Sequence, residues 1–210
     1  MKTGMNLDAI GLKYGTDKSS QEHNFLNFYE GFLEKKRGEA ISLIEIGVYD
    51  GASVKMWSEY FKNGSITGVD INPEVVKHSG ERIHIEIGDQ SSIECLIKLA
   101  MERGPFDVIV DDGSHIWDHQ ITTLQYLFPF LKSGGIYILE DIDTSYGTFA
   151  DAYRGRGDIS AVDYLKKLCD YMIGDRVLNI SAEKDAFIRE YARKIEHISF
   201  YRRTSVIKKA

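Results

Sequence analysis

The sequence predicts an α/β fold built on a doubly wound, mostly parallel sheet, with an antiparallel C-terminal hairpin, a helical N-terminal cap and a helical insertion. Two observations predict the sheet. From Ile41 onward, short apolar runs alternate with segments of helical periodicity, which is typical of βαβ units. Glycines and acidic residues follow several of the apolar runs, at the strand ends where ligands bind in such folds.

The apolar runs and the helical periods predict the elements in order. The predicted strands are 42–48, 66–71, 83–87, 106–110 and 135–140. The predicted helices between them are 54–61, 73–78, 91–103 and 115–131. Two further apolar runs, 198–201 and 204–207, flank Arg202-Arg203 and predict the closing hairpin.

We expect one domain over residues 1–210, divided into four segments. The aromatic stripe of residues 25, 28, 29 and 32 predicts a packed helix in a cap formed by 1–40. The cofactor-binding core is expected over 41–143, and the closing strands over 191–210. Residues 144–190 form an insertion that follows the last strand end directly, which favours a lid.

The composition narrows the class of partner. A hydrophobic content of 43% with 28% charged residues is typical of a folded domain. The formal net charge of -6 argues against nucleic acid as a partner and favours small molecules. No run approaches the roughly 20 apolar residues of a membrane span, and the first residues lack the apolar core of a signal peptide. We therefore expect a cytoplasmic protein.

The turn after the first strand has the features of a cofactor-binding loop. Gly47 and Gly51 allow a tight turn and a close approach of a ligand to the backbone. Asp70 closes the second strand, where a carboxylate accepts hydrogen bonds from ribose hydroxyls. The carboxylates expected in this crevice are Glu45, Asp50, Asp70, Asp89 and Asp111. Such a crevice suits a cation better than a pyrophosphate, so S-adenosylmethionine is the predicted cofactor.

A second acidic group follows the fourth and fifth predicted strands. Asp112 comes after the fourth strand, and Glu140 and Asp141 end the fifth. Neighbouring strands lie about 4.8 Å apart, so these three carboxylates can converge, and a divalent cation would relieve their repulsion. Oxygen ligands favour Mg²⁺, Mn²⁺ or Ca²⁺ over zinc. His115, three residues after Asp112, is a candidate general base beside the metal.

Two further residues are candidates for substrate contact. His119 lies four residues after His115, on the same face of the predicted helix. Tyr146 is the third residue of the insertion and has a ring that can stack on a sugar. A packed or solvated histidine explains His119 equally well, and a role in the core is the commoner explanation for an aromatic residue such as Tyr146.

Together these pieces resemble class I S-adenosylmethionine-dependent methyltransferases, which have a Rossmann-like fold. More narrowly, they resemble the metal-dependent sugar O-methyltransferases of the macrocin and mycinamicin type and their bacterial polysaccharide relatives labelled cephalosporin hydroxylase-like. The resemblance spans about residues 11 to 145. The matching pieces are Lys13-Tyr14-Gly15-Thr16-Asp17-Lys18, Glu45 to Gly51, Gly88-Asp89-Gln90, Asp111 to His115, and Glu140-Asp141.

The resemblance implies methyl transfer to a sugar hydroxyl, in a nucleotide sugar, a surface polysaccharide or a glycosylated metabolite. It implies that Gly47 and Gly51 face the methionine part of the cofactor, Asp70 the ribose, and Asp89 with Gln90 the adenine. Glu45 and Asp111 would complete the cofactor crevice.

The same resemblance implies roles for the remaining motifs. The segment holding Tyr14, Gly15 and Thr16 would fold over the methionine end of the cofactor. Asp112, Glu140 and Asp141 would hold Mg²⁺ or Mn²⁺, with His115 as the catalytic base. Relatives of this type often form homo-oligomers.

Three alternatives remain open at the level of sequence. His115, His119 and Glu140 could hold zinc in a metal-dependent hydrolase, although no glutamate comes directly after the first histidine. The chain could also be a non-catalytic nucleoside-binding module, for which the additional carboxylates would be unnecessary. A nicotinamide oxidoreductase is disfavoured by the glycine spacing and the acidic crevice.

Overall fold

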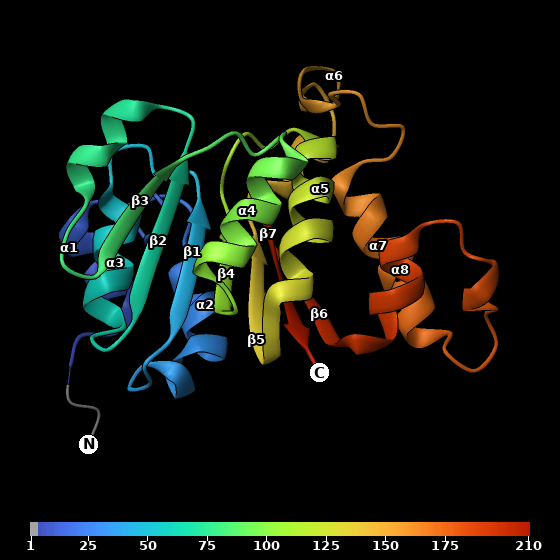
Figure 1. Cartoon of the computed structure of the whole chain (residues 1–210), viewed down its shortest axis with the longest axis horizontal. Helices are drawn as coiled ribbons and strands as arrows, with labels where there is room; N and C mark the ends of the chain where they lie inside the picture. The colour runs from blue at the N-terminus through green and yellow to red at the C-terminus, as the bar shows by residue number, and fades with distance from the viewer. Residues whose placement is uncertain (1–3) are drawn as a thin grey trace.

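The computed structural model describes residues 4–210, so the first three residues of the expected cap lie outside the described residues. One seven-stranded sheet forms the centre, in the order β3-β2-β1-β4-β5-β7-β6 (Figure 1). Its strands are β1 (Ser42–Ile46), β2 (Ser65–Asp70), β3 (Ile83–Ile87), β4 (Phe106–Asp111), β5 (Leu131–Leu139), β6 (Ile195–Tyr201) and β7 (Thr204–Lys209). Strands β1 to β5 pair in parallel, whereas β7 is antiparallel to both β5 and β6. This is the mostly parallel sheet with a closing antiparallel hairpin that the sequence predicts.

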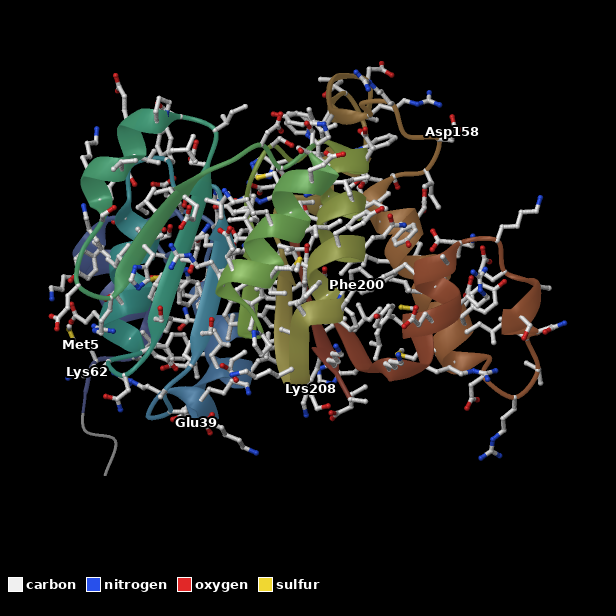
Figure 2. The ribbon with its side chains drawn as sticks, viewed as in Figure 1. Met5, Glu39, Lys62, Asp158, Phe200 and Lys208 are labelled. Atoms are coloured by element: carbon white, nitrogen blue, oxygen red, sulfur yellow. The ribbon has the colours of Figure 1, made fainter. Side chains whose placement is uncertain are left out.

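Helices cover both faces of the sheet. The α-helices are α1 (Leu7–Tyr14), α2 (Leu26–Leu33), α3 (Ala52–Tyr60), α4 (Ile93–Arg103), α5 (Trp117–Leu127), α6 (Phe149–Tyr153), α7 (Ala161–Ile173) and α8 (Ala186–Tyr191). One apolar core lies under α1, α2 and α3, and a second lies under α4, α5, α7 and α8. Side chains fill the space between the sheet and the helices of both layers (Figure 2).

Alternation along the strands divides their side chains between the two cores. On β1, Leu43 belongs to the core under α3, whereas Ile44 and Ile46 belong to the core under α4 and α5. Both faces are therefore buried, which explains why the strand is a nearly continuous apolar run. The parallel strands end at one edge of the sheet, and the turns that leave this edge carry the candidate site.

The structure corrects the limits of the predicted helix 115–131. The helix α5 begins at Trp117, because His115 has a φ of 58° and lies in the left-handed region. It ends at Leu127, where Pro129 takes part in a short 3₁₀ turn, and β5 begins at Leu131, four residues before the predicted start. The predicted helix 73–78 is a 3₁₀ helix that begins after the cap residue Asn72.

The insertion contributes to the core as well as to the sheet edge. Tyr164, Leu165 and Leu168 of α7 are buried in the core under α5, so this part of the insertion is packed. The stretch around α6 lies beyond the carboxyl ends of the strands, at the top of Figure 1. Of the helices in residues 4–210, the longest is α7 with 13 residues, and none is long and apolar enough to cross a membrane.

Candidate active site

Two adjoining cavities open at the carboxyl edge of the sheet. The smaller has a volume of about 490 Å³, and the larger has a volume of about 700 Å³. The residues that line both are Gly47, Tyr49, Asp50, Asp112 and Gly113. The cavities are therefore two parts of one crevice, divided along the turns that follow β1 and β4.

The turn after β1 approaches the turn after β4 so closely that residue 47 must be glycine. Its φ is 92°, and a Cβ atom at this position would overlap the carbonyl oxygen of Asp112. Gly51, with a φ of 78°, precedes α3, and a Cβ atom there would overlap the ring of His78. Gly47 lines both cavities, whereas Gly51 lines neither. The structure thus places Gly51 in the packing of the loop, away from the cavity walls.

Asp70 is held in its charged form at the wall of the larger cavity. Its carboxylate accepts hydrogen bonds from the backbone N–H groups of Val48 at 2.9 Å, Tyr49 at 3.0 Å and Asn72 at 2.9 Å. Burial favours the neutral acid, but these backbone donors outweigh it and lower the pKa of Asp70. The carboxylate is therefore an ionised acceptor pointing into the end of the crevice expected to hold ribose.

Asp89 and Gln90 also line the larger cavity. A hydrogen bond from Ser91 lowers the pKa of Asp89. The amide nitrogen of Gln90 donates to Asp111 at 2.6 Å, and its amide oxygen accepts from the backbone N–H of Ser114 at 2.9 Å. Gln90 therefore ties the end of β3 to the loop that carries the acidic group.

Glu45 and Asp111 lie beneath the crevice and do not line it. Both side chains are fully buried. Glu45 accepts hydrogen bonds from Ser53 and Trp57, and Asp111 accepts from Gln90 and Tyr137. Burial raises the pKa of each carboxyl to about 7. The structure separates them from the cavity walls, although they support the residues that form those walls.

The raised pKa of Glu45 predicts a pH-dependent stability. Because the folded protein favours the protonated acid, the stability that protonated Glu45 contributes is fully present below pH 4.5 and is lost as the pH rises through 7. The free energy of unfolding of Glu45→Gln should therefore rise relative to that of the unaltered protein as the pH increases from 5 to 8, by up to about 3 kcal/mol. Urea unfolding in EDTA at both pH values measures it. An equal difference at the two pH values would contradict the prediction.

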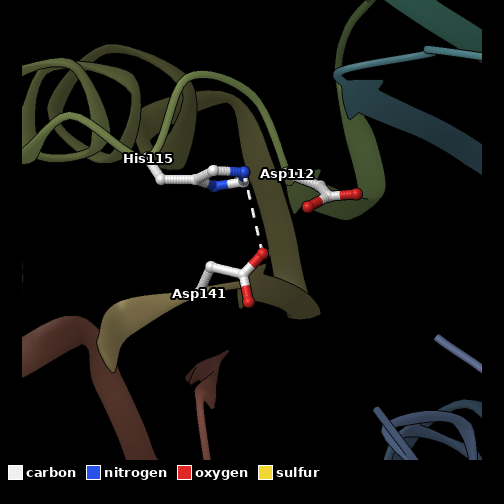
Figure 3. A group of neighbouring side chains, drawn as sticks. All are labelled: Asp112, His115 and Asp141. Carbon is white, nitrogen blue, oxygen red and sulfur yellow. Dashed lines mark ion pairs between the residues drawn. The ribbon is translucent and has the colours of Figure 1, made fainter. Parts of the chain in front are cut away.

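Asp112, His115 and Asp141 come together at the smaller cavity (Figure 3). One ligand atom from each lies within 4.8 Å of the other two, and Nε2 of His115 is 3.6 Å from Oδ2 of Asp141. His115 and Asp141 have φ values of 58° and 50°, in the left-handed region that non-glycine residues seldom adopt. Such backbone strain concentrates at functional sites.

Glu140 lies beside this group but faces a different partner. Its side chain is buried, and Oε2 is 2.9 Å from Nζ of Lys18. Its other oxygen, Oε1, is buried without a hydrogen-bond partner in the described part of the chain. Of the three carboxylates expected to bind metal, the structure therefore groups Asp112 with Asp141 and leaves Glu140 turned toward Lys18.

The electrostatics of the group favour an added cation. Burial, together with the charge of Asp112, raises the pKa of Glu140 well above its usual range, despite the opposing effect of Lys18. Burial also raises the pKa of Asp141, an effect that His115 opposes. The buried oxygen of Glu140 and the nearby group of oxygen and nitrogen donors fit a small divalent cation.

Lys18 is a site residue that the sequence motifs did not predict. It lies within the Lys13–Lys18 hexapeptide, in which only Tyr14, Gly15 and Thr16 were expected to contact the cofactor. Its side chain is 1% exposed and forms ion pairs with Asp112 and Glu140. Burial lowers the pKa of Lys18, but the surrounding carboxylates outweigh that effect and raise it well above its usual value. The available signal was a lysine in a segment expected to fold over an acidic crevice.

The remaining candidates divide between the crevice and other surfaces. Gly15 and Thr16 line the smaller cavity, whereas the hydroxyl of Tyr14 donates to Glu59 on α3 at 2.8 Å and lines neither part of the crevice. His119 lines the larger cavity, with its Nδ1 atom 2.8 Å from the hydroxyl of Ser114. Tyr146 is 55% exposed and lines neither cavity.

Comparison with known proteins indicates a methyltransferase family. Residues 44–142 match a family model described as a methyltransferase domain. Demethylmacrocin O-methyltransferase of Streptomyces fradiae is 35% identical over 175 residues, covering 79% of this chain and 44% of the relative. The 8-demethyl-8-alpha-L-rhamnosyl tetracenomycin-C 2'-O-methyltransferase of Streptomyces olivaceus is 38% identical over 176 residues, covering 78% of this chain and 45% of the relative. The chain thus matches less than half the length of these relatives.

Solved structures agree. The MycE methyltransferase from the mycinamycin biosynthetic pathway, in complex with Mg and SAH, superposes with a TM-score of 0.87 at 28% identity, covering 98% of this chain and 54% of MycE. Its complex with Mg, SAH and mycinamycin VI gives a TM-score of 0.84, covering 99% of this chain and 55% of MycE. This chain therefore belongs to the class I S-adenosylmethionine-dependent methyltransferases with a Rossmann-like fold, and within them it resembles the macrocin- and mycinamicin-type sugar O-methyltransferases.

Proposed function

We propose that this chain is an S-adenosylmethionine-dependent and divalent-metal-dependent O-methyltransferase that acts on a sugar hydroxyl. The observation that carries the proposal is the group of Asp112, His115 and Asp141 at the smaller cavity, with Asp112 shared by the larger one. This arrangement supports a metal and a base next to the place where a cofactor would end. The names of the relatives, which are O-methyltransferases of glycosylated metabolites, support the acceptor class.

The larger cavity is the proposed cofactor site. Asp70 accepts hydrogen bonds from the ribose, and Asp89 with Gln90 faces the adenine. Gly47 lets the methionine part approach the backbone, and Gly15 with Thr16 borders the neighbouring space. The acidic wall suits the sulfonium and ammonium groups of S-adenosylmethionine.

The proposed metal ligands are Asp112, Glu140 and Asp141, binding Mg²⁺ or Mn²⁺. Support comes from the proximity of Asp112 to Asp141 and from the unpartnered Oε1 of Glu140. A bound dication would supply positive charge that makes the acceptor hydroxyl more acidic. The two carboxylates at the smaller cavity would also orient a sugar there.

His115 is the proposed general base. Its Nε2 faces Asp141, and both side chains line the smaller cavity. As the sulfur–methyl bond of the cofactor breaks and the oxygen–methyl bond forms, the hydroxyl proton passes to His115, leaving S-adenosylhomocysteine.

The ring of Tyr153 has its centroid 6.5 Å from that of His115, which supports a lid role for the stretch around α6.

The composition of the chain bears on its substrate class and its location. The net charge of -6 supports a small sugar-containing substrate over nucleic acid and is compatible with a cytoplasmic enzyme of metabolite or polysaccharide biosynthesis. We propose that residues 1–210 act as one domain, which could assemble into a homo-oligomer. The zinc hydrolase has less support, because His119 pairs with Ser114 and is not one of the described residues grouped with Asp112.

The proposal is tested by binding and by turnover. Calorimetric titration should show binding of S-adenosylhomocysteine and, separately, of Mg²⁺ or Mn²⁺. Methyl transfer is then screened on nucleotide sugars, glycosylated metabolites and polysaccharide fragments with and without EDTA. Transfer that is unaffected by chelator would contradict the metal requirement, and binding of NAD in preference to S-adenosylhomocysteine would contradict the cofactor.

The base is tested by replacing His115 with glutamine. We expect His115→Gln to lower kcat by about 100-fold or more, because general-base catalysis typically contributes that much. Binding of S-adenosylhomocysteine should stay unchanged, since His115 does not line the larger cavity. A kcat within twofold of the unaltered protein would exclude His115 as the base.

A further inference from the structure

Lys18 occupies a position that the proposed reaction does not yet use. It lies between α1 and α2, in the N-terminal cap, and its side chain is 1% exposed. Its Nζ atom pairs with Oδ2 of Asp112 and lies 2.9 Å from Oε2 of Glu140 and 3.9 Å from Oε1 of Glu45. One buried ammonium thus connects the ends of β1, β4 and β5 to the cap.

Lys18 pairs with one oxygen of Asp112 and one oxygen of Glu140, which are two of the three proposed metal ligands. Glu140 bonds Lys18 through Oε2, while Oε1 is buried and has no partner among residues 4–210. Asp112 bonds Lys18 through Oδ2. Figure 3 shows one oxygen of Asp112 turned toward His115 and Asp141 and the other turned away. Lys18 therefore holds one oxygen of each of these two carboxylates, and the second oxygen of Glu140 makes no hydrogen bond among residues 4–210.

With Lys18 charged, the formal charge of the three proposed metal ligands and Lys18 balances that of a divalent cation. Asp112, Glu140 and Asp141 carry three negative charges when ionised, and one ammonium within bonding distance leaves a formal charge of -2. Without the ammonium, the repulsion between half-buried Asp112 and buried Glu140 would be uncompensated. Replacing a group that hydrogen-bonds to a metal ligand typically lowers metal affinity by 10- to 100-fold.

We propose that Lys18 is a positioning residue of the metal site, which orients Asp112 and Glu140. This inference rests on the proposed function, because it assigns Lys18 a role toward the proposed metal. The competing explanation is that Lys18 only neutralises buried acids for folding. Metal affinity in folded variants separates the two, since a role limited to folding would leave that affinity unchanged.

The test compares two variants that differ only at Lys18. Lys18→Met alone would strand several buried carboxylates, so it is combined with Glu45→Gln, which removes one negative charge and keeps every proposed ligand. The reference is Glu45→Gln alone. Lys18→Arg keeps the positive charge, and Lys132→Met removes an exposed lysine ion pair, with Asp107, away from the crevice. Thermal melts establish folding, and calorimetry measures binding of Mn²⁺ and of S-adenosylhomocysteine.

We expect the double variant to bind Mn²⁺ at least about tenfold more weakly than Glu45→Gln, with S-adenosylhomocysteine affinity within twofold. Lys18→Arg should lose less Mn²⁺ affinity than the double variant, and Lys132→Met should lose none. Equal Mn²⁺ affinity in the double variant and its reference would overturn the inference, as would complete loss of Mn²⁺ binding in Lys18→Arg. Absence of Mn²⁺ binding in the unaltered protein would instead overturn the metal site itself, and this inference with it.

Discussion

Asp141→Asn is expected to lower methyl transfer by about 100-fold or more while the protein stays folded. Asn has nearly the size of Asp and tolerates the left-handed conformation, which matters because residue 141 has a φ of 50°. The substitution removes the charge that faces His115 and would bind the metal. Since burial raises the pKa of Asp141, losing this carboxylate should not destabilise the folded state near neutral pH.

The measurement combines metal titration, turnover and thermal unfolding. Asp141→Asn should bind Mn²⁺ more weakly and S-adenosylhomocysteine normally, because Asp141 does not line the larger cavity. The control is Asp143→Asn, which makes the same chemical change two residues further along and outside both cavities. Comparable losses in the two variants would show that the effect does not depend on the proposed metal site.

Gly47→Ala should have the largest effect on the crevice as a whole. A Cβ atom at this position would overlap the carbonyl oxygen of Asp112, and the backbone φ of 92° is already unfavourable for alanine. Left-handed strain costs about 1–2 kcal/mol and overpacking about 1–3 kcal/mol, so we expect a loss of about 3 kcal/mol in the free energy of unfolding. Because the turns after β1 and β4 must separate, binding of S-adenosylhomocysteine should also be lost.

Gly134→Ala is the matched control for this prediction. Gly134 has a φ of 70°, but nothing lies within 4 Å of a Cβ atom built there. Its substitution carries the conformational strain without the overlap, and should cost about 1–2 kcal/mol with cofactor binding intact. Urea unfolding and calorimetry of both variants measure the difference. Equal destabilisation would mean that the close approach of the two turns is not what requires glycine at position 47.

Much of the fold was accessible from local pattern. Apolar runs and helical periods are properties of neighbouring residues, so the sequence predicted the strand 83–87 with the bounds that β3 has, and it predicted the closing hairpin. Element limits were less accessible. The start of α5 depends on the left-handed conformation of His115, which the turn after β4 imposes and no helical period reveals.

The candidate site was also only partly predictable from the sequence. The position of acidic residues after strands predicted that Asp112, Glu140 and Asp141 would converge, since parallel strands end at one edge, and the structure groups the first and the last of these. The direction of each side chain was not predictable at that level. Glu45 and Asp111 turn beneath the crevice into hydrogen bonds with buried residues, and Tyr14 turns toward α3.

By itself, the sequence determined the order of the elements, the glycine turn and the acidic strand ends, because each depends on residues close together in the chain. Only the tertiary structure decided that Lys18 would reach Asp112, 94 residues away, and Glu140, 122 residues away. The physical reason is that buried charge must find a partner wherever the packed chain brings one. That partner depends on how the cap packs against the sheet, which no local pattern encodes.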